Sequence, residues 1–309
     1  MNLEFVLCGS PTDAFWSQAA MFRLSLDSLG DVYRNARLAF CVGASRRVSL
    51  PERWKPYFKN IEVIWVDERE YLREGDRAQS DLTYRAVSYA DLSFNCDADT
   101  LLLRPFPDGF LEQLYASPAI YGVIAHYPPP LAANPALRDD CALWSALGEH
   151  IISRRLSLDH RYTLLDELKP CPFYVNYGFV AATPKLFRQL HEQLRIVEPQ
   201  IRDVLDNEYY GQLGVAVAVE RASLATKALP MRFNFPNDPI ADQLYPHELA
   251  NVVLIHYLRT KHFDRHKIFA NQQEFERFMA APLSGSNFVF REYVRTLTGG
   301  QYPFDGRDN

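Results

Sequence analysis

The sequence predicts an α/β fold in which a mostly parallel central sheet is covered by helices on both faces. Short apolar segments alternate with helical segments through the first half of the chain, and each apolar segment ends in glycine or a polar side chain. The 309 residues are 48% hydrophobic and 23% charged, which suits a chain with a large core. No repeat, low-complexity tract or long linker interrupts the chain, so we expect one compact unit.

The elements of the first half follow one another regularly. LEFVLCGS predicts a strand that ends in Gly9 and Ser10, and apolar residues then recur at helical spacing from about 13 to 29. ARLAFCVGA and IEVIWVDE predict the second and third strands, the third of which ends at Asp67. A helix over 82–89 leads to a fourth strand, in DLSFNCDAD.

In the second half, predicted strands and helices alternate less regularly. AIYGVIAHYPPP predicts a strand and a proline-rich loop, whereas 128–172 carries mainly helical signals. FYVNYGFVAATPKLF predicts a strand broken at Gly178 and a helix that begins at Pro184. A helix over 206–219 and two strands follow, in ALPMRFNFP and in NVVLIHYL, the latter ending at His256. Two helices, over 272–281 and 288–297, complete the chain.

Charge and cysteine content argue against several classes of protein. A net charge of −5 does not favour nucleic-acid binding, which usually requires a basic face. The five cysteines are widely spread and form no C-x-x-C pair, which favours reduced thiols over a zinc ribbon or a disulfide framework. The first residues lack the features of a signal peptide, and no apolar run is long enough to span a bilayer. We therefore expect a cytoplasmic protein.

Two aspartates, Asp97 and Asp99, directly follow the fourth strand with only Ala98 between them. Carboxylates this close repel each other, so a positive group must offset their charge. One interpretation is a pair of turn residues. The other is a site for Mg²⁺ or Mn²⁺, which prefer carboxylate oxygens and accept substrate phosphates as further ligands. Ligands of parallel sheets bind beyond the carboxyl ends of the strands, where this pair lies.

A diphosphate ligand would require basic groups nearby, and the segment LIHYLRTKHF supplies four candidates at the end of another strand: His256, Arg259, Lys261 and His262. Taken alone, a histidine on an apolar strand is more often a core residue, and Lys261 is more often a solvated lysine. The combination with two aspartates favours a functional interpretation.

Five segments in this order resemble the motifs of GT-A glycosyltransferases, and in particular the glycogenin-like, family-eight branch of retaining enzymes. They are NCDADTLLLRPF, VNYGFVAATPKLF, LDNEYYGQLGVAVAV, ALPMRFNFP and LIHYLRTKHF, spread over about 90–261. The resemblance implies a Rossmann-like GT-A nucleotide-diphospho-sugar transferase fold in a single catalytic domain over 1–309. Within it, 1–127 would bind nucleotide and metal, 128–270 would face the acceptor, and 271–309 would form a helical tail.

The resemblance implies roles for residues at matching positions. Asp97, Asp99 and His256 match the ligands of Mn²⁺ or Mg²⁺, with Asp99 in direct contact. Lys261 matches the lysine that meets the donor phosphates, but it comes one residue early, so either Lys261 or His262 would take this role.

Further positions match the groups that contact the donor. Asn176 and Gly178 match the lining of the sugar and acceptor pocket, although Tyr177 between them fills a slot that is often small in the family. Asp206 and Glu208 match acidic residues near the reacting sugar. On the other interpretation, Asn176–Gly178 form a strand bulge and the two acidic residues favour a helix start.

The nucleotide is expected at the carboxyl ends of the first and third predicted strands. Arg85 resembles a donor-contacting basic residue, although its helix is about one turn short. The base would lie against the loops that contain Cys8, Gly9 and Ser10 and the residue Asp67.

The implied reaction is transfer of a sugar from a nucleoside-diphosphate donor, with UDP preferred, to an acceptor hydroxyl with retention of configuration. The sequence does not determine whether the acceptor is a glycan, a lipid-linked glycan, a protein or a small molecule. Residues 128–172 are expected to select it. Alternatives are a sugar-nucleotide pyrophosphorylase, a non-catalytic sugar-nucleotide or glycan-binding protein, and a nucleic-acid base glucosyltransferase. The first would carry a basic, glycine-rich loop where this chain has CGSPTDAFWS.

Overall fold

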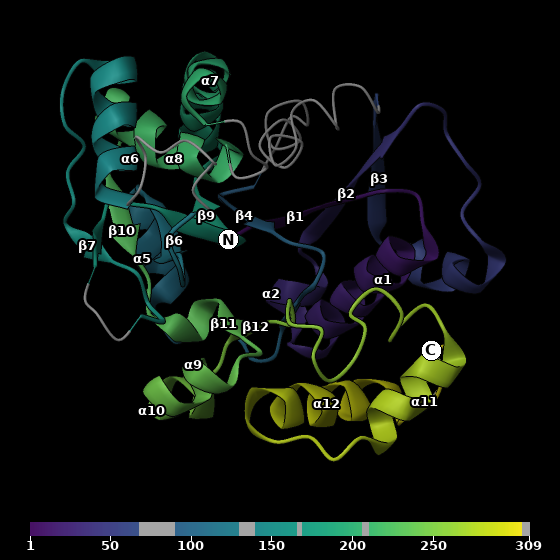
Figure 1. The fold of residues 1–309 in the computed structure, drawn as a ribbon. Coiled ribbons are helices and arrows are strands. Elements are labelled where there is room, and N and C mark those ends of the chain that lie inside the picture. Colours follow the sequence, from purple (N-terminus) through teal and green to yellow (C-terminus); the bar gives the residue numbers. More distant parts are fainter. Residues whose placement is uncertain (68–89, 130–139, 166–168, 206–209, 305–309) are drawn as a thin grey trace.

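A computed structural model describes residues 1–67, 90–129, 140–165, 169–205 and 210–304. Its centre is a seven-stranded sheet with the strand order β10-β6-β9-β4-β1-β2-β3 (Figure 1). The strands are β1 (Leu3–Gly9), β2 (Arg37–Ala44), β3 (Ile61–Asp67), β4 (Leu92–Cys96), β6 (Ile120–Ile124), β9 (Val175–Ala182) and β10 (Thr226–Ala228).

The sheet is mostly parallel, as the sequence predicts. β1 pairs in parallel with β2 and β4, β2 pairs with β3, and β6 pairs with β10. Among these seven strands β9 alone is reversed, and it pairs antiparallel with both β4 and β6. The carboxyl ends of β1 to β4 therefore meet along one edge, at Gly9, Asp67 and Cys96.

Helices cover both faces of the sheet. One hydrophobic core joins the strands to α1 (Asp13–Ser28), to the 3-10 helix η1 (Glu52–Phe58), and to α11 (Gln272–Ala280) and α12 (Gly285–Thr298). A second core joins the opposite faces of β6 and β9 to α6 (Asp140–Leu147), α7 (Pro184–Val204) and α8 (Tyr210–Arg221). Residues alternate between the two cores along β9, because successive side chains of a strand point to opposite faces. The predicted fold class is confirmed.

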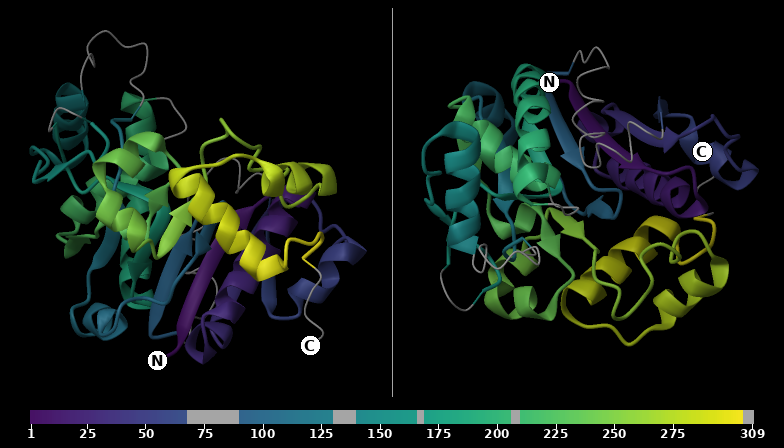
Figure 2. Two further views of the ribbon diagram at one scale, coloured as in Figure 1. Left: turned by 90° about the horizontal axis from the view of Figure 1, so that it is seen from below. Right: turned by 45° about the horizontal axis from the view of Figure 1, so that its top comes forward.

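Shorter elements complete the architecture. They are α2 (Asp31–Arg34), α5 (Phe110–Ala116), the π-helix η3 (Gly148–Ile152), the 3-10 helix η4 (Met231–Phe233), α9 (Pro239–Leu244) and α10 (Pro246–Ala250), with the strand pair β7 (His160–Arg161) and β8 (Pro170–Cys171). The C-terminal helices α11 and α12 pack into the first core, and α12 lies beside α1 (Figure 2).

Two predicted strands differ from the structure. ALPMRFNFP does not form one strand: β10 and β11 (Phe235–Pro236) belong to different sheets and are separated by η4, which begins after Pro230. Proline fixes φ and donates no hydrogen bond, so a continuous ladder through this segment is unfavourable. β9 is not broken at Gly178, but its register against β6 shifts between Val175 and Val180. The helix predicted over 82–89 and the start of the one predicted over 206–219 lie outside the described residues.

A small three-stranded sheet shapes the carboxyl edge of the main sheet. Its strand order is β11-β12-β5, where β5 spans Thr100–Leu102 and β12 spans Leu254–His256. The chain leaves β4 at Cys96, turns through Asp97–Asp99 and enters β5. The turn between the two sheets therefore carries both aspartates.

Candidate metal centre and active site

The pairing of β5 with β12 brings His256 beside the two aspartates. The strands are antiparallel, and their register places His256 opposite Thr100. Two further hydrogen bonds hold the turn: the N–H of Tyr257 donates to the carbonyl of Asp99 at 3.0 Å, and Thr100 Oγ1 donates to the carbonyl of Asp97 at 2.7 Å. Backbone pairing thus places the three residues next to one another.

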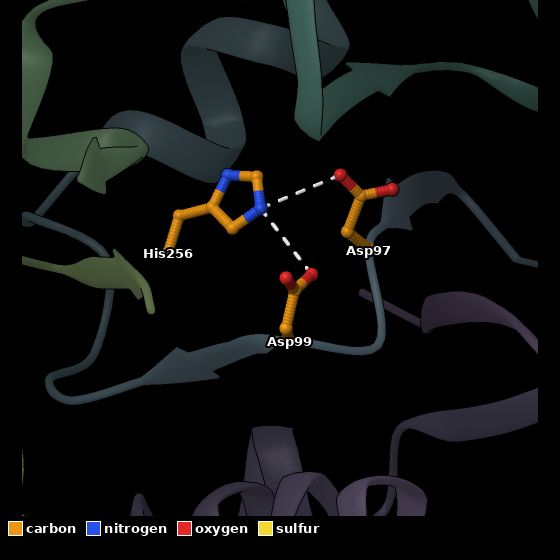
Figure 3. A group of neighbouring side chains, drawn as sticks. All are labelled: Asp97, Asp99 and His256. Atoms are coloured by element: carbon orange, nitrogen blue, oxygen red, sulfur yellow. Dashed lines mark ion pairs between the residues drawn. The ribbon is translucent and has the colours of Figure 1, made fainter. Parts of the chain in front are cut away.

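The side chains of Asp97, Asp99 and His256 point toward one another (Figure 3). His256 Nε2 lies 3.5 Å from Asp97 Oδ2 and 3.3 Å from Asp99 Oδ1. One ligand atom from each residue falls within a mutual distance of 4.8 Å. Two carboxylate oxygens and one imidazole nitrogen are a donor set that suits Mn²⁺ and can hold Mg²⁺, with open positions for substrate oxygens. The residues present therefore fit such an ion.

Asp99 and His256 change each other's pKa values, and the charge of Asp97 also acts on the pKa of His256. Burial alone would raise the pKa of Asp99, but the positive charges of His256 and Arg265 outweigh burial and lower this pKa to about 2. Burial disfavours the imidazolium form of His256, yet Asp99 and Asp97 raise the pKa of its ring above the ordinary value. Asp99 therefore stays ionised, as a metal ligand must.

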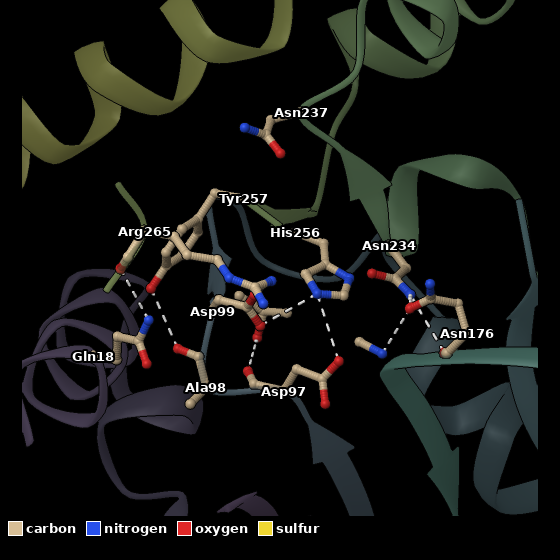
Figure 4. Close-up of polar contacts among 12 residues, drawn as sticks. Gln18, Asp97, Ala98, Asp99, Asn176, Asn234, Asn237, His256, Tyr257 and Arg265 are labelled. Atoms are coloured by element: carbon tan, nitrogen blue, oxygen red, sulfur yellow. Dashed lines mark hydrogen bonds and ion pairs between the residues drawn. The ribbon is translucent and has the colours of Figure 1, made fainter. Parts of the chain in front are cut away.

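Arg265 is a cation of this site that the sequence analysis did not identify. Its Nη1 lies 2.5 Å from Asp99 Oδ2, on the carboxylate oxygen that does not face His256. The carbonyl of Arg265 accepts a hydrogen bond of 3.1 Å from Nε2 of the buried Gln18 in α1 (Figure 4). Its only sequence signal is a position nine residues beyond His256, in a loop rich in basic residues.

Asn176 and Gly178 lie on β9 next to His256. The N–H of Gly178 donates to Asn176 Oδ1 at 2.8 Å. A Cβ on Gly178 would stand 2.3 Å from His256 Nδ1 and 2.4 Å from Asn234 Oδ1, closer than any real contact. Position 178 thus requires glycine, because the His256 ring and the Asn234 amide occupy the space of a side chain.

His126 is a second buried histidine near the centre. It follows β6, and its Nδ1 is 2.8 Å from Thr163 Oγ1. Burial, followed by the positive charges of His256 and Arg259, lowers the pKa of His126 to about 3. The ring therefore adds no charge to the site at neutral pH.

The structure places the other predicted residues as follows. Cys8 and Gly9 end β1 and Ser10 follows them; a Cβ on Gly9 would clash with the ring of Phe15 at 2.4 Å. Asp67 ends β3 and pairs with Ala44.

Lys261 and His262 are exposed in the loop after β12, and it is Arg265 rather than either of them that contacts Asp99. Arg85, Asp206 and Glu208 lie outside the described residues. Among the described helices, none combines the length and the apolar character that a membrane span requires.

Comparisons with known proteins place the fold. No protein-family model matches the chain, and no curated protein matches it in sequence. Among solved structures, it is similar to the galactosyltransferase LgtC in complex with donor and acceptor sugar analogues, with a TM-score of 0.50 and 14% identity over 93% of this chain and 99% of that one. An active-site mutant of LgtC matches equally well, with a TM-score of 0.50 and 14% identity over 93% of this chain and 99% of that one. The chain therefore has the GT-A fold.

Proposed function

We propose that the chain is a metal-dependent glycosyltransferase, which moves a sugar from a nucleoside-diphosphate donor to a hydroxyl group of an acceptor. The observation that carries this proposal is the group Asp97, Asp99 and His256, gathered at the carboxyl edge of a GT-A sheet. A solved protein of the same fold, LgtC, is a galactosyltransferase that was crystallised with donor and acceptor sugar analogues. We expect UDP as the nucleotide of the donor and retention of configuration at the transferred sugar, as the family resemblance implies.

The metal ion, Mn²⁺ or Mg²⁺, would act as a Lewis acid on the diphosphate and stabilise the charge that develops on the leaving group. Asp97, Asp99 and His256 would hold it, and the fixed charge of Arg265 lies on the same side of Asp99. Lys261 and His262 remain candidates for contact with the phosphates. Preorganised positive charge of this kind is often the largest contribution to such a reaction.

The sugar would lie between this centre and β9. Asn176, together with Asp206 and Glu208, remains the proposed set that contacts the reacting sugar, and Arg85 and the Cys8–Ser10 turn are proposed to contact the nucleotide. The acceptor is a hydroxyl compound, whether glycan, lipid-linked glycan, protein or small molecule.

A donor panel tests the proposal. UDP- and GDP-sugars are incubated with the protein, with and without Mn²⁺, and release of the nucleoside diphosphate is measured. We expect slow hydrolysis of one donor that requires Mn²⁺ and that falls at least about 100-fold in Asp99→Asn, which removes a ligand charge. Asp31→Asn is the control, because this carboxylate is exposed and pairs with Arg34 at 2.8 Å.

Two results would contradict the proposal. Metal-dependent donor binding without turnover, with hydroxyl acceptors added, would indicate a non-catalytic binding protein. Absence of both binding and turnover would leave Asp97 and Asp99 as turn residues.

A further inference from the structure

The orientation of two side-chain amides beside the metal centre follows from one backbone donor. The Gly178 N–H donates to the side chain of Asn176 at 2.8 Å, so the accepting atom must be the oxygen, Oδ1. Asn234 Nδ2 donates to the same oxygen at 2.9 Å and lies 3.4 Å from the carbonyl of Asn176. The NH₂ group of Asn234 is therefore committed to Asn176, and its own oxygen must point the other way.

That oxygen faces the ring of His256. Asn234 Oδ1 and His256 Nδ1 both lie against Gly178, in the space that a Cβ would fill, and Figure 4 shows the amide oxygen on the side of the ring. Both atoms are buried, and among the described residues the structure records no hydrogen bond to either of them, including one between the two. Buried polar atoms are almost always paired, and these two have complementary chemistry when Nδ1 carries a proton.

We propose that Asn234 is a positioning residue, whose Oδ1 accepts the Nδ1–H of His256 and thereby holds the ring in its metal-binding tautomer. In that tautomer the lone pair of Nε2 faces Asp97 and Asp99, at 3.5 and 3.3 Å. Partners on the far nitrogen set the tautomer and orientation of metal-binding histidines in general. The inference rests on the metal site of the proposed function.

Without this acceptor the neutral ring would take the other tautomer. A proton on Nε2 could be donated to either carboxylate, whereas a proton on Nδ1 would be buried without a partner. The Nε2 atom would then be unable to bind a metal ion. Asn234 thus offsets the preference that the two aspartates impose on the metal-free ring.

The test compares two buried asparagines on one segment. Asn234→Leu removes the acceptor, and Asn234→Ala is a second variant with less steric demand. Asn237→Leu is the matched control, because Asn237 is equally buried but its Nδ2 donates to the carbonyl of Arg259 and to Asn287, both at 3.0 Å. The dissociation constant for Mn²⁺ is measured from the electron paramagnetic resonance signal of the free ion, and circular dichroism establishes folding.

A second readout does not depend on metal. Nitrogen-15 spectra of the histidine rings, in metal-free protein at alkaline pH, report which nitrogen carries the proton, and His256→Ala identifies the signals of His256. We expect Asn234→Leu to reduce the population protonated on Nδ1 and to weaken Mn²⁺ binding about 10- to 100-fold. Asn237→Leu should retain both the Nδ1-protonated population of His256 and the wild-type affinity for Mn²⁺.

The inference is overturned if the tautomer of His256 is the same in Asn234→Leu and wild type. It is also overturned if the Asn234 and Asn237 variants weaken Mn²⁺ binding equally, which would indicate a general loss of packing. If the wild-type protein binds no Mn²⁺ at all, the proposed function fails, and the ring spectra alone decide the role of Asn234.

Discussion

At the scale of single residues, Gly178 shows how a missing side chain positions a functional group. The His256 ring and the Asn234 amide approach its Cα so closely that any Cβ would overlap them. The glycine on β9 therefore allows β12 to bring its histidine against the main sheet. The segment Asn176–Gly178 thus contributes to the metal centre by leaving space for the His256 ring.

The first prediction concerns Gly178→Ala. The new methyl group must displace the His256 ring, so we expect the affinity for Mn²⁺ to fall at least about tenfold and the free energy of unfolding to fall by about 1–3 kcal/mol. Gly122→Ala is the control, since its Cβ would meet the side chain of Val175 at 2.8 Å and should reduce stability alone. Calorimetric titration and urea unfolding measure the two quantities. Unchanged Mn²⁺ affinity in Gly178→Ala would show that the ring can move without cost.

The second prediction concerns Arg265, whose guanidinium contacts the carboxylate of Asp99. Its positive charge opposes a divalent cation at short range, so we expect Arg265→Gln to tighten Mn²⁺ binding about tenfold at low salt, or about 1.4 kcal/mol. Lys267→Gln is the control, because Lys267 pairs with Asp264 at 3.0 Å. Weaker binding in Arg265→Gln would mean that the arginine orients Asp99 more than it repels the metal.

The third prediction concerns pH and His126. The pKa of this ring is lowered to about 3 in the folded protein, chiefly by burial, whereas an unfolded histidine titrates near about 6.5. The unfolded state therefore binds more protons between these values, and stability is lost as the pH falls through them.

We expect the free energy of unfolding to decrease by up to about 1.4 kcal/mol per pH unit between about pH 6 and 4.5. His126→Asn should remove this slope. The raised pKa of His256 acts on the alkaline side instead, because its contribution is fully present below the unfolded value and is lost as the pH rises. Urea unfolding at several pH values measures the slope, and an equal slope in the variant would contradict the assignment to His126.

At the scale of elements, one ionic network ties the parallel strands together at the edge opposite the metal centre. Glu4 in β1 is fully buried, forms an ion pair with Arg37 in β2, and accepts a hydrogen bond of 2.8 Å from Ser93 in β4. Arg37 also contacts Glu62 in β3 at 2.7 Å. A buried carboxylate that loses its charged partner strongly destabilises the folded protein.

The fourth prediction follows from this network. Arg37→Ala leaves the Glu4 carboxylate with Ser93 as its remaining side-chain partner among the described contacts. We expect a loss of about 3 kcal/mol in the free energy of unfolding, with no change in Mn²⁺ affinity. Arg34→Ala breaks an exposed ion pair with Asp31 and should cost less than about 1 kcal/mol. Urea unfolding of the two variants makes the comparison, and equal losses would contradict the role of burial.

At the scale of the whole molecule, both halves of the chain share one sheet. β9 from the second half pairs with β4 from the first, and α11 and α12 pack into the core that contains β1 and β2. Tyr257, next to His256, stacks on Phe290 of α12 with ring centroids 4.5 Å apart. The metal centre is therefore supported by segments from the beginning, middle and end of the sequence.

The fifth prediction is a single cooperative unfolding transition. Because neither half can keep its core without the shared sheet, circular dichroism and tryptophan fluorescence should give the same urea midpoint. Trp16 and Trp54 lie in the first core and Trp144 in the second. The fluorescence of the Trp144→Phe variant therefore follows unfolding of the first core without the signal from the second. Separate midpoints would show that the two cores unfold independently.

The sequence alone determined most of the elements and the position of the aspartate pair. Apolar periodicity and turn residues are local properties, so the strands β1 to β4, the helix α1 and the turn with Asp97 and Asp99 could be predicted from them. The segment ALPMRFNFP was predicted wrongly, because its apolar residues suit a strand while its prolines divide it between two sheets.

The tertiary structure decided which distant groups meet. The register of β5 against β12 sets His256 beside Asp99, and the loop after β12 brings Arg265 to the same carboxylate across 166 residues of sequence. The approach of both Asn234 and His256 to β9 depends on the absence of a side chain at Gly178. Such contacts arise from sheet pairing and packing between remote segments, and no local pattern of residues encodes their distance or orientation.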